Sequence, residues 1–242
     1  MKGRSAAPAA SGKGATEPRG REARGGDGRT ALSRESVIEA ALAIADGEGL
    51  DALTVRRLAS ELGAAPMALY RYFRNKEELV TGLFDHVIAA YDPAEHGHED
   101  WKQELRSSFR WFRSALMSHP GIMPVLTRRV GVRHNTDRIT ESVLSALRRV
   151  TRNDQEASRA FFSLVSFTVG FTALETAATE QRRAAGIDDE QEWLRLSRLQ
   201  FEAMPSGEYP SLVALAAHIG EYWTDPQFED GLGRLLDSIA LA

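Results

Sequence analysis

The sequence predicts an all-α protein in which a head of three helices precedes a larger helical bundle. Three observations lead to this fold class. Apolar residues recur at a 3.6-residue spacing from residue 37 onward. Several of these periodic stretches begin at a good N-cap or a proline and end at a glycine, and alternating strand patterns are absent. We place an arm at residues 1–31, the head at residues 32–80 and the bundle at residues 81–242.

The composition is that of an ordinary globular protein. Of the 242 residues, 43% are hydrophobic and 26% are charged, which excludes wholesale disorder and low-complexity classes. Cysteine is absent, so disulfide scaffolds and thiol nucleophiles are excluded. We find no run of about 18 apolar residues and no apolar stretch of a secretory signal. We therefore expect a cytoplasmic protein that has no membrane as a partner.

The N-terminal arm is basic and lacks large apolar residues. Residues 1–30 carry seven basic and three acidic side chains, a charge of +4, whereas the whole chain has a net charge of −4. Fifteen of these thirty residues are Gly, Ala or Pro, so the arm cannot bury enough apolar surface to become ordered. Two interpretations remain open: a solubilising tail or mis-assigned start, and an arm that lies along a polyanion.

The head begins with two helices. Ser33 is a suitable N-cap for the first, whose apolar stripe runs from Val37 to Ala45 and ends at two glycines. Thr54 caps the second helix. This helix stops at Gly63, because glycine can take the left-handed conformation that ends a helix.

A third helix and a fourth follow closely. Pro66 is favoured in the first turn of a helix, since its missing N–H would have no partner there, and we place the third helix at residues 66–74. Asn75 caps the fourth helix, and Glu78 three residues later completes a pattern similar to a capping box. The apolar face of this fourth helix continues to Tyr91.

The second and third helices form a helix-turn-helix pattern, which any compact helical protein can also contain. At 100° per residue, Leu69 and Phe73 face inward, so Met67, Arg71 and Arg74 lie near the opposite face. Such basic, apolar and phenolic side chains suit the major groove of DNA. Residues 53–76 carry five basic side chains and one acidic side chain, a local charge of +4 that favours DNA as the partner.

Two stretches of the head resemble the DNA-binding domain of the TetR family of transcriptional regulators. They read LTVRRLA at residues 53–59 and LYRYFRNKEEL at residues 69–79, and the resemblance covers about residues 33–80. It implies that Arg56 reaches a base or phosphate, that Met67 and Ala68 face bases, and that Lys76 grips a phosphate. The predicted DNA-binding residues are Thr54, Arg56, Met67, Ala68, Tyr70, Arg71, Tyr72 and Lys76.

Some of these residues also have a purely structural interpretation. A single Tyr at position 70 or 72 is often half-buried packing, and Arg57 is interpreted as an exposed helix charge. The family often carries Ser or Thr where Ala64, Ala65 and Ala68 stand here. We therefore expect the protein to read DNA more through Arg71 and apolar contacts.

The bundle is expected to contain helices at residues 101–118, 121–129, 135–150, 154–178, 188–204 and 226–240. Residues 161–178 and 228–236 resemble the ligand-binding and dimerisation domain of the tetracycline-repressor branch. This resemblance implies a homodimer in which the long helix and the last helix pair with their copies. A dimer is also expected because one three-helix head contacts too few base pairs.

A ligand pocket within the bundle is predicted less directly. Its candidate residues are Trp111, Phe112, Met123, Phe167, Phe171 and Thr168. An aromatic residue at helical spacing is more often core than ligand contact, and the hydroxyls of Thr168 and Thr172 can bond back to their own helix. His96 and His98 are metal-binding residue types, but two histidines in a linker need further ligands. We therefore predict no metal and no cofactor, only an unidentified small-molecule effector.

These observations predict a ligand-responsive DNA-binding regulator rather than an enzyme. A repressor released from its operator by a small molecule is favoured, with an activator of the same fold as an alternative. A helical enzyme and a protein-interaction module are further alternatives. The chain has no glycine-rich phosphate loop, no Gly-x-Ser-x-Gly, no His-Glu-x-x-His and no Cys. The fourth helix is expected to transmit the ligand signal, because it joins the head to the bundle.

Overall fold

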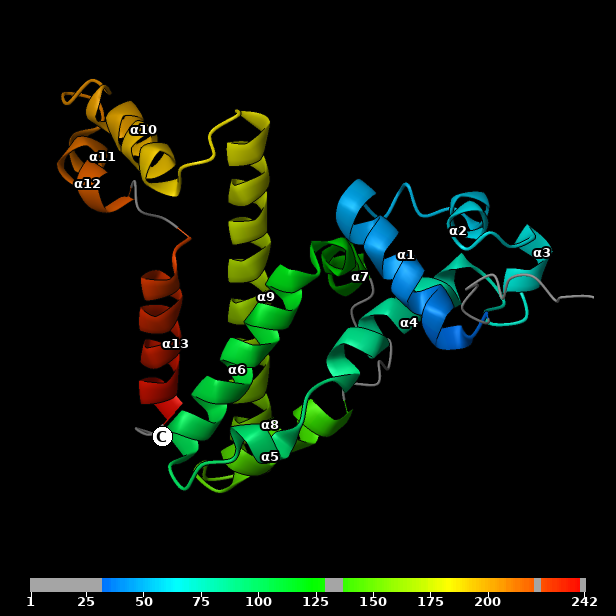
Figure 1. Cartoon of the computed structure of the whole chain (residues 1–242). Coiled ribbons are helices and arrows are strands. Elements are labelled where there is room, and N and C mark those ends of the chain that lie inside the picture. The colour runs from blue at the N-terminus through cyan, green and yellow to red at the C-terminus, as the bar shows by residue number, and fades with distance from the viewer. Residues whose placement is uncertain (1–31, 129–136, 220–222, 240–242) are drawn as a thin grey trace, which may run out of the picture. The chain divides into compact units, whose positions relative to one another are not determined.

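The computed structural model describes residues 32–128, 137–219 and 223–239 (Figure 1). Leu32–Ala242 cluster into one compact unit. The predicted N-terminal arm, residues 1–31, lies outside the described residues.

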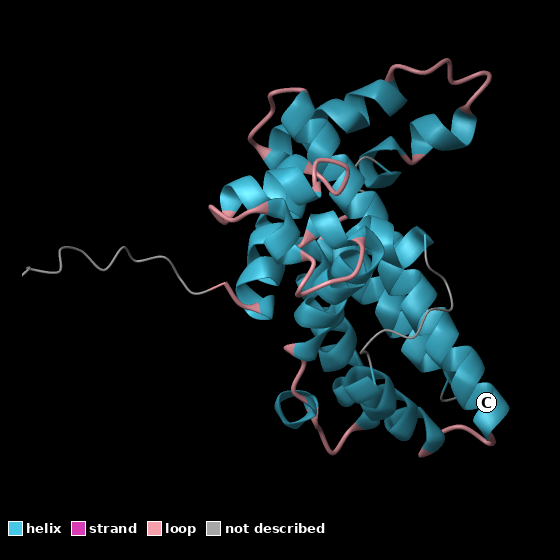
Figure 2. Cartoon of the chain, turned by 90° about the vertical axis from the view of Figure 1, so that its right-hand side faces the viewer, coloured by secondary structure: helices cyan, strands magenta, loops and turns pink. Residues whose placement is uncertain are grey.

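All the regular structure within the described residues is helical (Figure 2). The head contains α1 (Arg34–Glu48), α2 (Val55–Glu61), α3 (Pro66–Leu69) and the start of α4 (Lys76–Ala89). The following elements are α5 (Pro93–His96), α6 (Trp101–Ser118), the 3-10 turn η1 (Pro120–Ile122), α7 (Met123–Arg128), α8 (Asp137–Arg148), α9 (Asp154–Ala184), α10 (Glu190–Glu202), α11 (Pro210–Ala214), α12 (Ala216–Ile219) and α13 (Asp225–Ile239). The all-α fold class is confirmed.

The predicted caps of the first two helices are confirmed. The Ser33 hydroxyl accepts a hydrogen bond from the backbone N–H of Ser36 at 3.0 Å. The Thr54 hydroxyl accepts one from the N–H of Arg57 at 3.1 Å. Gly63 has a φ of 58°, the left-handed conformation that ends α2.

The third helix is shorter than predicted. It ends at Leu69 rather than near residue 74, because the following turn is closed by i→i+3 bonds such as Tyr72 N–H to Leu69 C=O at 2.9 Å. The capping pattern of α4 also differs. Asn75 accepts from the Glu78 N–H at 2.8 Å, but the Glu78 carboxylate accepts from the Arg74 N–H at 2.8 Å instead of from its cap residue.

The bundle follows the predicted order with shifted ends. The helix predicted at residues 101–118 is confirmed as α6, whereas α9 extends to Ala184, six residues beyond its predicted end. The sequence did not reveal α5, α11 and α12. Each has only four or five residues, too few for a 3.6-residue period to be recognised.

One hydrophobic core runs from α1 to α13. The helix α4 packs against α1 in the head and against α6 and α7 in the bundle. The long helix α9 packs against α6, α8 and α13, and Figure 1 shows α13 alongside it. The head therefore meets the remaining helices through α4 and also through α1, which packs against η1.

The helix α9 is long and apolar enough to cross a membrane by length and composition alone. The sequence prediction of no membrane-spanning helix rested on the lack of an uninterrupted run of about 18 apolar residues, whereas this finding averages the hydropathy over a window of α9. Core helices of soluble proteins pass the same test, and only a minority of this apolar stretch is buried. Because most of this apolar stretch is exposed, we expect another surface to cover it.

Candidate functional site

The exposed face of the helix-turn-helix carries the side chains that the sequence placed there. Met67 is 75% exposed and Tyr70 is 46% exposed, while Leu69 and Phe73 are 0% and 4% exposed. Arg71 is also exposed, and its guanidinium has no ion-pair partner in the part of the chain that the structure describes. This face therefore presents an available charge beside apolar and phenolic groups.

Arg57 differs from Arg71 because it is already paired. Its guanidinium lies 2.7 Å from Glu48 and 2.7 Å from Glu61. The hydrogen bond that Arg57 donates to Glu48, followed by the one that it donates to Glu61, raises the pKa of Arg57 above its usual range. These carboxylates neutralise the charge, which agrees with the interpretation of Arg57 as a helix charge only.

Three of the predicted DNA-binding residues make internal bonds. Thr54 is the cap of α2. The Tyr72 hydroxyl donates to the Leu32 carbonyl at 2.6 Å, and the Lys76 ammonium donates to the Leu50 carbonyl at 3.3 Å. The two acceptors are distant in sequence, so helical periodicity could not reveal these bonds. Arg56 is exposed, and Ala68 is partly buried.

An apolar cavity of about 140 Å³ lies between α4, α6, α7, α8 and α9. Among the described residues, four phenylalanines, four aliphatic residues and two residues with hydroxyl side chains line it. The lining residues are Phe84, Ser108, Phe109, Phe112, Leu126, Ile139, Thr140, Val143, Phe161 and Val165. Among the pocket residues predicted from the sequence, Phe112 is in this set.

The other predicted pocket residues lie elsewhere. Trp111 packs edge-on against Tyr91, with ring centroids 5.0 Å apart. Phe167 and Phe171 join Phe228 in an aromatic cluster between α9 and α13. Met123 is buried in the core.

The two threonines of α9 behave differently from one another. The Thr172 hydroxyl donates to the Thr168 carbonyl at 2.8 Å. This is a bond to the carbonyl of its own helix, as the sequence analysis considered for these threonines. The Thr168 hydroxyl is buried, and it has no hydrogen-bond partner within the described residues.

Helical spacing offered a signal for one missed lining residue. Phe109 precedes Phe112 by three residues and therefore shares its face. For Phe84 no such signal exists, because the sequence assigns it to the apolar face of α4 without showing that this face lines a cavity. The cavity thus contacts the helix that reaches into the head.

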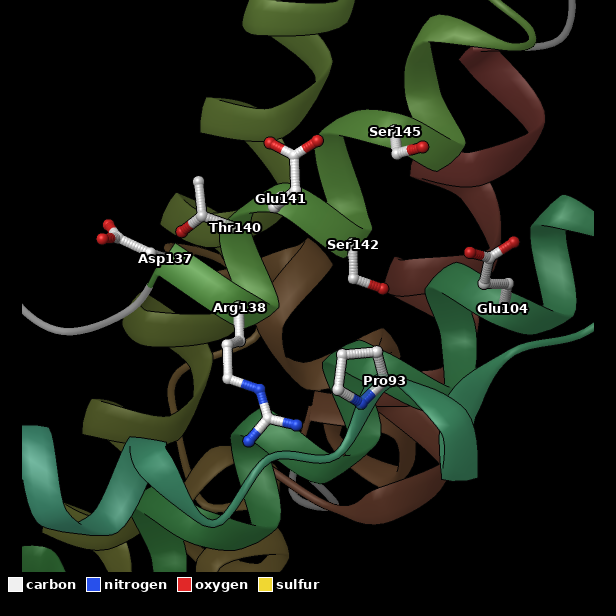
Figure 3. Close-up of a pocket in the computed structure, with 8 residues that line it drawn as sticks. All are labelled: Pro93, Glu104, Asp137, Arg138, Thr140, Glu141, Ser142 and Ser145. Carbon is white, nitrogen blue, oxygen red and sulfur yellow. The ribbon is translucent and has the colours of Figure 1, made fainter.

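A polar groove of about 800 Å³ opens beside the cavity (Figure 3). Thr140 of α8 lines both spaces. Glu104 lies in the groove and pairs with Arg149, while Asp137 and Glu141 are exposed. The groove gives the α8 side of the cavity a polar border.

Tyr91, just beyond the end of α4, connects this region to α6 and α8. It is fully buried, and its hydroxyl lies 2.8 Å from the Ser108 hydroxyl and 3.3 Å from that of Ser142. The His96 ring stacks on Tyr91 with centroids 4.9 Å apart, and its Nδ1 lies 2.8 Å from the Ser107 hydroxyl. Burial lowers the pKa of His96, and nearby carboxylates offset this only in part.

His96 and His98 join no cluster of metal ligands among the residues that the structure describes. No group of three His, Cys, Asp or Glu side chains able to hold a metal ion is found within residues 32–128, 137–219 and 223–239. His96 instead packs against Tyr91 and bonds Ser107.

An exposed recognition face on a helix-turn-helix that packs against a helical bundle with an apolar cavity defines a ligand-responsive DNA-binding regulator. Two family models match the chain. "Bacterial regulatory proteins, tetR family" covers residues 37–83, and "Tetracyclin repressor-like, C-terminal domain" covers residues 92–241. The protein belongs to the tetR family of bacterial regulatory proteins.

Similar proteins include repressors from Streptomyces and Escherichia coli. The HTH-type transcriptional repressor DrrR1 of Streptomyces coeruleorubidus is 31% identical over 212 residues, which is 86% of this chain and 77% of DrrR1. The class A tetracycline repressor from transposon 1721 of Escherichia coli is 29% identical, and the match spans 87% of this chain and 92% of that protein.

A solved structure of a family member shows the same fold. The Streptomyces coelicolor TetR family protein ActR in complex with (S)-DNPA has a TM-score of 0.70 and 26% identity, over 87% of this chain and 98% of ActR. ActR has also been solved in complex with actinorhodin. The relatives are therefore regulators, and at least one of them binds small molecules.

Proposed function

We propose that this protein is a transcriptional repressor that binds operator DNA through its helix-turn-helix and is released by a small molecule held in the apolar cavity. One observation carries the DNA-binding part: Met67, Tyr70 and Arg71 are exposed on the recognition face while Leu69 and Phe73 are buried beneath it. The names of similar repressors and the ligand complexes of ActR support the rest.

The side chains of α3 and its following turn act on the DNA in different ways. Arg71 pairs with a guanine, while Met67 and Ala68 contact thymine methyl groups. Arg56 and Tyr70 reach phosphates or bases at the edge of the groove. Thr54, Tyr72 and Lys76 act near the phosphate backbone, where their internal bonds also hold the head in shape.

The proposal includes the organisation and class of the protein. Residues 32–80 serve as the DNA-binding domain and residues 81–242 as the ligand-binding and dimerisation domain. We infer a cytoplasmic regulator without catalytic activity, in line with its relatives. Its effector is a small molecule rather than a cofactor.

Two copies of the head are needed for the proposed function. The recognition helices of such dimers enter successive major grooves about 34–36 Å apart. The exposed apolar surface of α9, which includes Phe162 and Leu174, supports an interface between two copies. Ligand in the cavity then favours a separation of the heads that no longer matches this spacing, and DNA affinity falls.

Fluorescence anisotropy tests the DNA-binding proposal. The protein is titrated against DNA from upstream of its own gene and against a scrambled duplex, over a series of salt concentrations. We expect tighter binding to the upstream DNA and a steep loss of affinity with salt, since DNA-bound counterions are released on binding. Arg71→Ala should weaken this binding and reduce the preference by about 1–3 kcal/mol.

Arg57→Ala is the matched control. It removes the same charge from the same domain, but this charge is already neutralised by Glu48 and Glu61. The preference for the upstream DNA should therefore stay close to that of the wild type. Equal losses in the two variants would contradict the assignment of Arg71 as the residue that reads the DNA.

A further inference from the structure

We propose that the Tyr91 hydroxyl is a two-position switch between Ser108 and Ser142, and that the effector is an uncharged aromatic compound whose hydroxyl or N–H sets the switch by donating to Ser108. This inference rests on the proposed function, because it names the class of molecule for the cavity and the residues that sense it. The evidence for it is the set of residues that line the cavity and the hydrogen bonds of Tyr91 with Ser108 and Ser142.

The cavity selects an uncharged ring. None of the ten lining residues that the structure describes carries a charge, so an ionic group placed against them would lose its hydration without gaining a partner from them. Four phenyl rings, those of Phe84, Phe109, Phe112 and Phe161, line the cavity and favour an aromatic guest. Its volume of about 140 Å³ is close to that of an engineered apolar cavity of about 150 Å³ that binds benzene.

A hydroxyl or N–H on the ring finds its acceptor in Ser108. This residue lines the cavity from α6 and is only 1% exposed. Its single proton is used on the Glu104 carbonyl, 3.0 Å away. The Ser108 oxygen therefore accepts the proton of Tyr91 at 2.8 Å and keeps one lone pair for a donor inside the cavity.

The Tyr91 proton has a second acceptor. The Ser142 hydroxyl on α8 lies 3.3 Å from the Tyr91 hydroxyl, and Figure 3 shows Ser142 on the groove side of that helix. A ligand that donates to Ser108 weakens the bond from Tyr91, because one oxygen then serves two donors. Tyr91 can then donate to Ser142 instead, so the Tyr91 hydroxyl stays hydrogen-bonded.

The switch lies where it can act on the head. Tyr91 follows the last turn of α4, the helix that packs against α1 of the head. Its ring is held between His96 and Trp111, so the hydroxyl has few positions available. A change of partner from α6 to α8 alters which helix holds the end of α4, and both arrangements satisfy the buried hydroxyl.

A pair of single-ring probes tests the switch on the whole protein. Dissociation constants for benzyl alcohol and toluene are measured by ligand-detected NMR, with benzoate as a charged probe of similar size. We expect benzyl alcohol to bind about fivefold more tightly than toluene, the effect of one net hydrogen bond, and benzoate to bind more weakly than either. Equal affinities for benzyl alcohol and toluene, or a preference for benzoate, would overturn the proposed ligand class.

Three variants should change the benzyl alcohol affinity in different directions. Tyr91→Phe removes the competing donor and should tighten benzyl alcohol binding several-fold. Ser142→Ala removes the alternative acceptor and should weaken it, while Ser108→Ala should abolish the preference over toluene. Toluene affinity should stay unchanged in Tyr91→Phe and Ser142→Ala, and Ser145→Ala, one turn further along α8, should behave as wild type. Changes of the same sign in Tyr91→Phe and Ser142→Ala would overturn the switch.

Amide hydrogen exchange follows the consequence for α4. Saturating benzyl alcohol, but not toluene, should change the exchange of residues 84–92 in the wild type, and this response should be lost in Tyr91→Phe. An unchanged exchange pattern would overturn the switch. If neither probe binds the folded wild-type protein, the cavity assignment fails, whereas the DNA-binding proposal is judged separately by the Arg71→Ala and Arg57→Ala titrations.

Discussion

Gly121 is a residue whose lack of a side chain the structure requires. A Cβ at this position would lie 2.5 Å from the carbonyl carbon of Ala45 and 2.6 Å from its oxygen. Because backbone atoms cannot move aside as a flexible side chain does, Gly121→Ala should destabilise the protein by about 1–3 kcal/mol. Urea denaturation followed by circular dichroism measures this change.

Gly207→Ala is the control for this prediction. A Cβ at Gly207 meets no atom within 4 Å, and alanine also lowers the entropy of the unfolded chain. Its stability should be unchanged or slightly raised. A similar loss in both variants would contradict the claim that the contact with Ala45 requires glycine.

Arg113 forms two ion pairs whose acidic partners differ in burial. Variants of the two partners therefore measure how burial changes the contribution of an ion pair to stability. Its guanidinium pairs with Glu175, and the two side chains are only 13% and 12% exposed. Glu175→Gln leaves this buried cation without its main partner, so we expect a loss of about 3–5 kcal/mol in the free energy of unfolding. Asp225 bonds the same guanidinium from an 83% exposed position, and Asp225→Asn should cost at most about 1 kcal/mol. Comparable losses would show that burial does not decide the strength of these pairs.

Residue patterns predicted local features better than distant partners. Ser33, Thr54 and Asn75 were recognised as caps because each bonds an N–H three residues away. The bond from Tyr72 to Leu32 spans 40 residues, and no periodicity encodes it. For the same reason, the sequence predicted Phe112 but could not show that Phe84 completes the cavity from another helix.

At the scale of elements, the short helix α5 fixes a histidine in a setting that disfavours its charge. His96, its last residue, has a pKa below the ordinary value of about 6.5, mainly because of burial. The unfolded chain therefore binds a proton at His96 more readily than the folded chain does. The stability contributed by neutral His96 is present above about pH 6.5 and is lost as the pH falls toward the folded pKa.

His96→Phe keeps a ring on Tyr91 but cannot be protonated. The free energy of unfolding of the wild type should fall between pH 7 and pH 5 more steeply than that of His96→Phe, as followed by urea denaturation at each pH. His98→Phe, at an exposed position, should keep the slope of the wild type. Parallel curves for the wild type and His96→Phe would show that His96 does not supply this dependence.

Element lengths depend on contacts that sequence patterns describe poorly. The recognition helix was expected to continue to about residue 74, since its residues keep a helical period, but i→i+3 bonds replace the α-helical pattern after Leu69. The helix α9 exceeded its prediction in the other direction because its polar last turns still form backbone hydrogen bonds up to Ala184. The order of the longer helices was predicted because amphipathic periods and caps mark them individually.

For the whole molecule, the exposed surface of α9 predicts a dimer. Phe162 is 63% exposed and Leu174 is 48% exposed. At 100° per residue they flank a stripe of small exposed residues, Ser166, Gly170 and Ala177. A Cβ on Gly170 would meet nothing within 4 Å, so the surface has room for a second helix to approach closely.

A double substitution on this surface should separate the two copies. Phe162→Arg with Leu174→Arg places two charges in an interface that must exclude water, and burying an unpaired charge is strongly unfavourable. We expect sedimentation velocity to show a dimer for the wild type and a monomer for the variant. Gln200→Arg, at an exposed position of α10, adds charge without touching this surface and should remain dimeric. The monomeric variant should also lose most of its DNA affinity, since one head makes only half of the contacts. A wild type that sediments as a monomer would contradict the interface, and the apolar surface of α9 would then require a different partner.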